Sequence, residues 1–286
     1  MNFSHHRAVS ESALEYGRGI AGGLIFSLPL IYTMEVWWAG FVLNPSRILL
    51  YVISTFGLLL LYNRFAGLRR DASMVEVAID SVEEMGIGLI LAALILWLTG
   101  QIDLQTEILE MTGKVVMEAM TVAIGVSVGS SQLGGDDGGD EGVSGHDEKE
   151  ESKYVPQAAI ALCGAILFAA NIAPTEEVAI IAMESPPWKI LLLALGSVLA
   201  AAAVLHYSGM YGAERHVAKD TLFLKVRGLL TTYAVALAGA AACLHFFGGF
   251  DGQPLGIALS MCVVAGVPAT LGASAGRLLI QTSSPQ

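Results

Sequence analysis

Two glutamates in apolar surroundings are the residues of this chain best placed to do chemistry. Glu35 lies in the segment FSLPLIYTMEVWW, and Glu177 lies in the segment FAANIAPTEEVAI. Thr33 and Thr175 each precede one of these glutamates by two residues. A carboxylate inside hydrocarbon is costly unless it is paired, protonated or hydrated. The two segments therefore suggest a pathway or a binding site for a cation or a proton.

Two further acids belong to the same hypothesis. Glu176 adjoins Glu177, and Glu118 lies near the start of a later apolar stretch. Arg18 marks the inner end of the first apolar stretch, so Glu35, 17 residues further along, lies about 25 Å higher in a helix. Several carboxylates near this level predict an electronegative cavity open to the outer side. Its main residues are Glu35 and Glu177, and its secondary contributors are Thr33, Thr175, Glu176 and Glu118.

Each segment also contains residues that disturb a helix. Pro29 removes a backbone donor and kinks the helix one to two turns before Glu35, and Asn171 and Pro174 can disturb the helix before Glu177. Broken helices at membrane depth are tolerated where protein or water satisfies the freed carbonyls. Transporters use such carbonyls together with carboxylates to hold cations. The breaks therefore agree with ion transport, but they do not identify a metal.

Two other interpretations of the glutamates remain open. Both side chains can reach water at the membrane interface and bind nothing, or they can be protonated and hydrogen-bonded to neighbouring helices. The protein would then be a non-transporting sensor or assembly factor. No phosphate-binding loop, nucleotide fingerprint, HExxH or GxSxG motif occurs in the chain, so we expect no enzyme, no cofactor and no nucleic-acid partner.

The composition predicts an all-α, polytopic membrane helix bundle. The 286 residues are 54% hydrophobic and only 14% charged, whereas soluble domains are about 25% charged. Stretches of about 20 apolar residues can cross a bilayer as helices. Eight transmembrane helices are predicted, at residues 19–43, 46–64, 79–99, 111–131, 155–183, 188–207, 223–247 and 255–279.

The basic residues predict the orientation in the membrane. With the amino terminus inside, twelve lysines and arginines fall on the cytoplasmic side, and only Arg47, Lys114 and Lys189 fall outside. The positive-inside rule therefore places both termini in the cytoplasm. Trp37 and Trp38 then lie near the outer interface, where aromatic belts occur. We expect a multi-pass protein of the inner, cytoplasmic membrane.

An internal repeat organises the chain. Residues 22–68 align without gaps with residues 164–210, pairing Thr33 with Thr175 and Glu35 with Glu177. An even number of helices in each copy gives both copies the same orientation, so two parallel four-helix repeats are predicted. A pore on their pseudo-axis, completed by homo-oligomerisation, would favour a channel, whereas broken helices favour a carrier. The predicted parts are a cytoplasmic N-terminus (1–18), the first repeat (19–131), a flexible acidic linker (132–153), the second repeat (154–279) and a tail (280–286).

The segment GLIFSLPLIYTMEVWW, followed by NPSR, resembles a family of integral membrane proteins of unknown function from bacteria and haloarchaea. This resemblance covers nearly the whole chain outside the acidic linker, and it implies no activity and no site residues. The Pro-Thr-Glu element at residues 174–176 is also similar to the repeated helices of cation/calcium exchangers. Exchanger repeats are inverted, whereas four helices per repeat imply parallel copies, so this second similarity is a chemical analogy.

Overall fold

The computed structural model describes residues 9–66, 73–132, 154–212 and 222–282, and every regular element within them is a helix. The first half of the described chain contains α1 (Val9–Ile31), α2 (Met34–Val42), α3 (Pro45–Ala66), α4 (Met74–Leu98) and α5 (Ile108–Gln132). The second half contains α6 (Tyr154–Ala170), α7 (Glu176–Glu184), α8 (Pro187–Gly212), α9 (Leu222–Phe246) and α10 (Leu255–Thr282). The predicted helical class is therefore confirmed.

The helices number ten among the described residues, and not the eight predicted, because the first and fifth predicted spans are each divided. The first span becomes α1 and α2, with a break at Tyr32 and Thr33, and the fifth becomes α6 and α7, with a break at 171–175. The other six spans correspond to single helices with similar ends. Six helices, α3, α4, α5, α8, α9 and α10, are long and apolar enough to cross a membrane.

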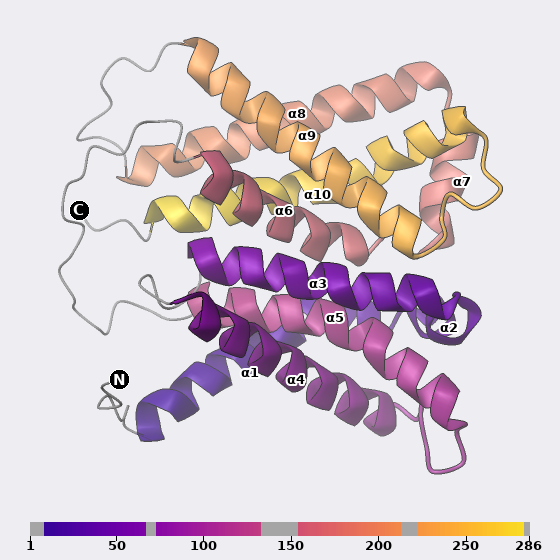
Figure 1. Ribbon diagram of the computed structural model, residues 1–286. Helices are drawn as coiled ribbons and strands as arrows, with labels where there is room; N and C mark the ends of the chain where they lie inside the picture. The colour runs from indigo at the N-terminus through magenta and orange to yellow at the C-terminus, as the bar shows by residue number, and fades with distance from the viewer. Residues whose placement is uncertain (1–8, 67–72, 133–153, 213–221, 283–286) are drawn as a thin grey trace.

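All long helices run roughly side by side between two ends of the bundle (Figure 1). We call the end at which α1 begins and α10 finishes the terminal end. The opposite end, which holds the short helices α2 and α7 and the connections 99–107 and 247–254, is the turn end. The predicted acidic linker, 132–153, falls almost wholly outside the described residues, as do the basic residues Arg7, Arg69, Arg70, Lys149, Lys153, Arg215 and Lys219.

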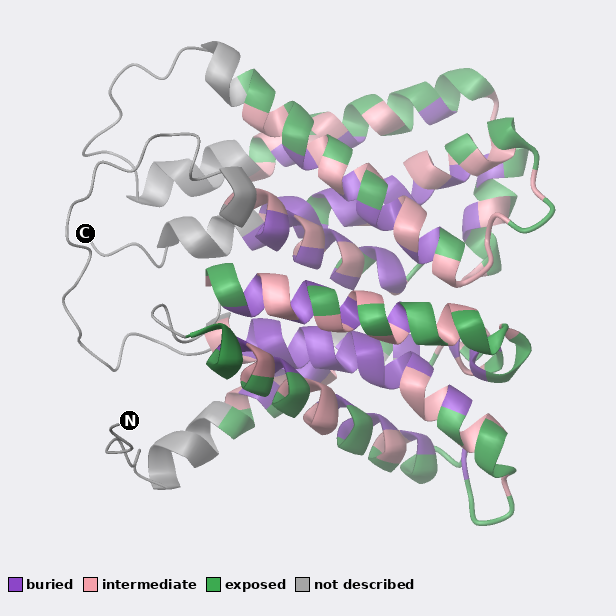
Figure 2. Cartoon of the chain, in the orientation of Figure 1, coloured by how far each residue is buried: buried purple, intermediate pink, exposed green. Residues whose placement is uncertain are grey.

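Helix α5 is the centre of the first half. It packs against α1, α2, α3 and α4, and residues 117–129 are buried without interruption (Figure 2). In the most apolar 18-residue stretch of α5, 72% of the residues are buried. In the corresponding stretches of the other five long apolar helices, 39% or less are buried. Close approach at both ends of α5 depends on glycine, since Gly129 faces Gly22 of α1 and Gly113 faces Gly40 of α2.

The second half has the same plan around α10. This helix packs against α6, α7, α8 and α9, and Gly272 of α10 faces Gly164 of α6. The glycine-rich segments of α5 and α10 therefore serve close helix packing. Prolines stand at the first positions of α3 and α8, where the missing N–H has no partner to lose.

The two halves meet through α3 and α5 on one side and α6 and α9 on the other. At the turn end, the ring of Tyr51 on α3 lies 5.5 Å from that of Phe246 on α9, centroid to centroid. Arg47 on α3 donates two hydrogen bonds to the carboxylate of Asp251, at 2.7 and 2.9 Å. The guanidinium holds the pKa of Asp251 below its ordinary value. The contact is therefore an ion pair at neutral pH, and it joins the halves.

Candidate functional site

Glu118 is the most deeply enclosed acid among the residues that the structure describes. It lies on α5, three turns from the turn end of that helix, and its exposed fraction is 0%. Neither of its carboxylate oxygens has a hydrogen-bond partner. Its neighbours in sequence, Met117 and Ala119, belong to the large apolar core of the protein. An isolated carboxylate in such surroundings must be neutralised by a proton or a cation, because an unpaired buried charge is very costly.

Three polar side chains approach Glu118 from neighbouring positions. The indole N–H of Trp37 of α2 is the donor nearest to acting on the Glu118 carboxyl group, but the two groups do not reach hydrogen-bond geometry. Tyr51 of α3 is also within electrostatic reach. The Tyr51 hydroxyl lies 3.0 Å from the hydroxyl of Thr121, which is one turn further along α5. These groups form a buried polar cluster at the junction of α2, α3 and α5.

Lys114 covers this cluster at the turn end. It lies one turn before Glu118 on α5, and its side chain is 11% exposed. Its ammonium group pairs with Glu110 at 2.6 Å and donates a hydrogen bond to the carbonyl of Gln101 at 3.0 Å. It also lies 5.6 Å from the centre of the Phe41 ring on α2. The ammonium is thus bound on the side away from Glu118, between the buried carboxyl group and the turn end.

A second polar cluster lies nearer the terminal end, and sequence analysis missed it. Asn63 of α3 donates hydrogen bonds to the carboxylate of Glu84 at 2.7 Å and to the hydroxyl of Ser81 at 3.1 Å, both on α4. Ser127 of α5 donates to the amide oxygen of Asn63 at 2.9 Å. Nearby, the hydroxyl of Tyr62 lies 2.7 Å from that of Ser131. The signal in the sequence was a group of three acids, Asp80, Glu83 and Glu84, inside the third predicted span.

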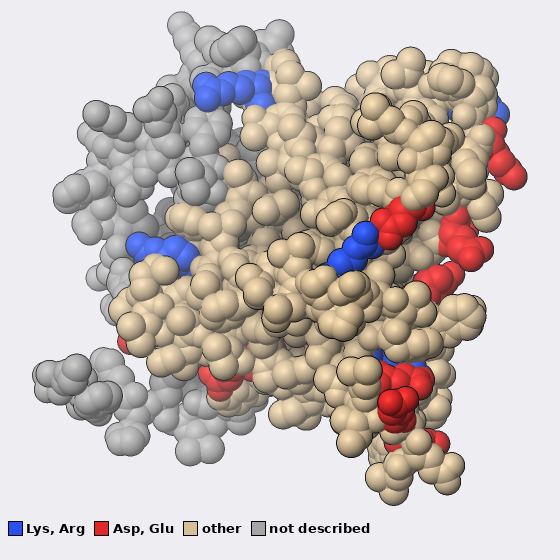
Figure 3. Space-filling model, turned by 45° about the vertical axis from the view of Figure 1, so that its right-hand side comes forward, with Lys and Arg blue, Asp and Glu red and all other residues tan. Residues whose placement is uncertain are grey.

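The two glutamates that the sequence analysis favoured, Glu35 and Glu177, lie at the turn end, in different halves. Glu35 is partly exposed in the first turn of α2, and Glu176 and Glu177 are exposed in the first turn of α7. Figure 3 shows acidic side chains gathered along this end of the molecule. Carboxylates in the first turn of a helix favour its positive end, so both positions also suit a structural role. Glu118 is separate from them, within the core.

The helix-disturbing residues are held by local hydrogen bonds. Thr33 donates its hydroxyl to the carbonyl of Pro29 at 2.7 Å, and Pro29 itself remains inside α1. Asn171 donates to the carbonyl of Leu167 at 2.6 Å, and Thr175 donates to that of Ile172 at 2.8 Å. Side chains therefore satisfy the carbonyls that the breaks release. Pro174 stands in the turn between α6 and α7.

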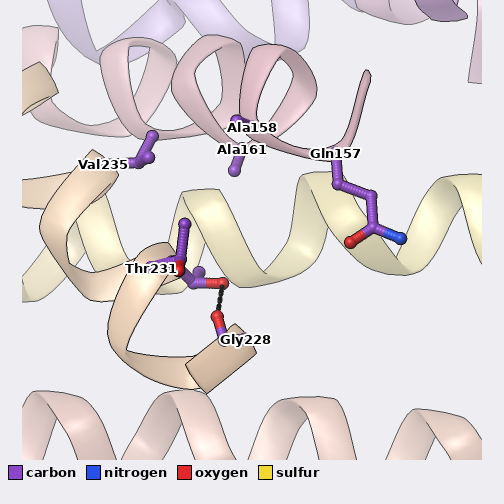
Figure 4. Close-up of a pocket in the computed structure, with 7 residues that line it drawn as sticks. Gln157, Ala158, Ala161, Gly228, Thr231 and Val235 are labelled. Atoms are coloured by element: carbon purple, nitrogen blue, oxygen red, sulfur yellow. Dashed lines mark hydrogen bonds between the residues drawn. The ribbon is translucent and has the colours of Figure 1, made fainter. Parts of the chain in front are cut away.

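A small pocket lies in the second half, between α6 and α9. Gln157 and Ala161 line it from α6, and Thr231 and Val235 line it from α9 (Figure 4). Its volume is about 20 Å³, which is enough for one water molecule. It is far too small for a solute of drug size. In the parts of the chain that the structure describes, no three His, Cys, Asp or Glu side chains are grouped to hold a metal ion.

Comparison with known proteins identifies a family. A family model described as "Putative integral membrane protein (DUF2391)" matches residues 15–280, which is most of the chain. No curated protein and no solved structure matches this chain. The resemblance drawn from the sequence is confirmed, and the match agrees with six helices long enough to cross a membrane.

Proposed function

The chain belongs to this family of integral membrane proteins, and we propose that it transports a proton or another cation, with Glu118 as the group that carries the ion. One observation carries the proposal. Glu118 is fully buried in the core, and both of its carboxylate oxygens are unpartnered. Ionisable residues inside membrane helices are costly, and they commonly mark ion pathways and proton relays. A structural glutamate would be expected to have hydrogen bonds instead.

In this proposal, the acids at the turn end mark the entrance of the ion pathway. Glu35, Glu176 and Glu177 place negative charge at this end, which raises the local concentration of cations. Thr33 and Thr175 stand at the N-cap positions of α2 and α7, the helices whose first turns contain these acids. In this proposal the three acids attract the ion, and Glu118 binds it.

The two halves are, in this proposal, parallel repeats with unequal roles. Support comes from register, because Thr33 and Thr175 both immediately precede nine-residue helices, α2 and α7. Gly22 and Gly164 also both face a glycine of the last helix in their half. The last two helices of the second half carry no acid, since Asp251 of their connection is the single acidic residue in residues 222–282. The ion path therefore belongs to the first half, and the second half supports it.

The same proposal places the turn end outside the cytoplasmic membrane. Three of the described basic residues, Arg47, Lys114 and Lys189, lie towards the turn end of their helices, and five, Arg18, Arg64, Lys225, Arg227 and Arg277, lie towards the terminal end. The positive-inside rule makes that end cytoplasmic. Ions would then reach Glu118 from the outer side.

Flux into proteoliposomes tests the proposal. Full-length protein is reconstituted, a membrane potential is imposed, and uptake of H⁺, Na⁺ and K⁺ is measured separately. We expect uptake of at least one ion by the wild type, and a fall to the rate of protein-free vesicles in Glu118→Gln. Glu107→Gln, at an exposed position before α5, is the matched control, and we expect it to keep most of the flux. Absence of wild-type flux, or full flux in Glu118→Gln, would contradict the proposal.

A second candidate is a non-transporting sensor or assembly protein. It is favoured by the local hydrogen bonds of Thr33, Asn171 and Thr175, which suit helix stabilisation rather than ion binding. This candidate predicts no flux above that of protein-free vesicles for any of the three ions. The same assay therefore separates the two functions.

A further inference from the structure

We propose that the transported ion is the proton, and that it passes along a polar seam between α3 and α5 from Glu118 to Glu84. This inference rests on the function proposed above and names its substrate and its second station. The seam consists of the Tyr51–Thr121 pair, Thr55, the Asn63–Ser127 pair and the Tyr62–Ser131 pair. A carboxyl group stands near each of its ends.

The surroundings of Glu118 suit a proton better than a metal ion. Hard cations such as Ca²⁺ take six to eight oxygen ligands, and Mg²⁺ takes six. Around Glu118 the interacting side chains are those of Trp37, which can only donate, and Tyr51. A proton needs one carboxylate oxygen and no coordination shell.

Glu84 provides the acceptor at the terminal end. Its carboxylate accepts a hydrogen bond from Asn63, which is bonded in turn to Ser127 of α5. Ser127 follows Glu118 by nine residues, so the two levels are about 14 Å apart along the helix. The charged and titratable groups that interact with Glu84 are Asp80 and Glu83 on its own helix and Cys163 on α6.

The transfer conserves charge and atoms at each step. Water at the turn end gives a proton to the Glu118 carboxylate, forming its O–H bond and leaving hydroxide in the bulk. That O–H bond breaks as the proton passes through seam hydroxyls and water, and a new O–H bond forms on Glu84. Glu84 then releases the proton to water at the terminal end, so one positive charge has crossed.

Apolar residues interrupt the seam halfway. Leu58, Leu59 and Ile124 are buried together between the level of Thr121 and the level of Ser127. The structure therefore holds the path shut, and transfer requires water to enter or these side chains to move. A gated proton carrier or channel agrees with this arrangement better than a permanently open pore.

The test compares Glu84→Gln with Glu107→Gln, which removes an exposed acid before α5, in vesicles that contain a pH-sensitive dye and a potassium-diffusion potential. In Glu84→Gln the new amide oxygen would still accept the hydrogen bond of Asn63, so a purely structural role predicts unchanged flux. We expect acidification by wild type and by Glu107→Gln, and none above the protein-free rate for Glu84→Gln. Glu84→Asp, which keeps a carboxyl group, should restore part of the flux and thereby exclude misfolding as the cause.

The outcomes separate this inference from the function on which it rests. Flux of Na⁺ or K⁺ without H⁺ would overturn the choice of proton, while ion transport through Glu118 would stand. Full proton flux in Glu84→Gln, together with none in Glu118→Gln, would remove Glu84 from the path only. Full flux in Glu118→Gln would overturn both proposals.

Discussion

At the scale of single residues, Glu118 is buried in the core although no other side chain in the described part of the protein forms a hydrogen bond with its carboxyl group. A buried polar atom without a hydrogen bond costs about 1–3 kcal/mol in proteins, and more if charged. Both oxygens of Glu118 are in this condition, and the Trp37 indole N–H beside them is as well. Such a cost is expected for a carboxyl group that binds an ion and then releases it.

Replacing Glu118 with methionine, which has a similar volume, should therefore stabilise the protein. We expect the free energy of unfolding to rise by about 1–3 kcal/mol, because the unsatisfied carboxyl group is removed while the packing is kept. Thermal unfolding in detergent, monitored by circular dichroism, measures the change. A loss of stability in Glu118→Met would indicate that the carboxyl group has structural partners. Glu107→Met, at an exposed position before α5, is the control and should have little effect.

The sequence identified Glu118 but ranked it below Glu35 and Glu177. The ranking followed the repeat, which pairs Glu35 with Glu177 and gives Glu118 no acidic counterpart. Repetition reports shared ancestry of two segments, whereas burial depends on which helix occupies the centre. That helix is α5, and hydropathy alone does not distinguish a central helix from a lipid-facing one. Glu84 was missed because it lies next to Asp80 and Glu83, so it reads as part of a polar helix start.

At the scale of elements, the contact between α2 and α5 places Trp37 beside Glu118. Gly40 and Gly113 permit this contact, since a methyl group on Gly40 would lie 2.6 Å from the carbonyl oxygen of Gly113. The break between α1 and α2 frees the short helix to lie against α5. Pro29 indicated a disturbance near this break, but the helix continues through Pro29 and ends two residues later.

Gly40→Ala should disturb this contact. We expect a loss of about 1–3 kcal/mol in unfolding free energy, because backbone atoms must move apart to admit the methyl group. Ion flux should fall as well, since Trp37 moves relative to Glu118. Gly57→Ala on α3 is the matched control, because a methyl group there meets nothing within 4 Å. Equal behaviour of the two variants would show that α2 is not held at this distance.

The apolar residues that interrupt the seam give a prediction in which proton flux rises instead of falling. Leu59 on α3 is fully buried, and Leu59→Ala should lower stability by about 2–5 kcal/mol through the cavity that it leaves. The same cavity admits water between Thr121 and Ser127, so proton flux should rise. Leu49→Ala, at a position on α3 that is 60% exposed, is the control and should leave flux unchanged. A fall in flux in Leu59→Ala would argue against an apolar barrier at this level.

At the scale of the whole molecule, the two halves are joined by packing of α3 and α5 against α6 and α9, and by the exposed ion pair of Arg47 with Asp251. The sequence predicted the helical class and most helix ends. It did not predict the pairing of Arg47 with Asp251, because the two residues are 204 positions apart and lie in different halves. Contacts between residues so far apart in sequence depend on how the two halves pack together, and local sequence patterns do not predict that packing.

The ion pair predicts how stability depends on pH. The pKa of Asp251 is lowered by Arg47, so the contribution of the pair is complete above the ordinary aspartate value of 3.8 and is lost as pH falls through the lowered value. Asp251→Asn should therefore reduce the melting temperature slightly at pH 7. The difference from wild type should disappear in strong acid, well below pH 3.8. A difference that vanished between pH 5 and pH 7 would indicate another titrating group.

The central claim is that Glu118 carries the transported ion rather than supporting the fold, and proton flux through Glu118→Met tests it most directly. Wild type and variant are reconstituted at equal protein-to-lipid ratio, and acidification is measured under the same imposed potential. We expect the variant to match protein-free vesicles although its melting temperature is no lower than that of wild type. Wild-type flux through Glu118→Met would contradict the account, because no carboxyl group would then be needed in the core.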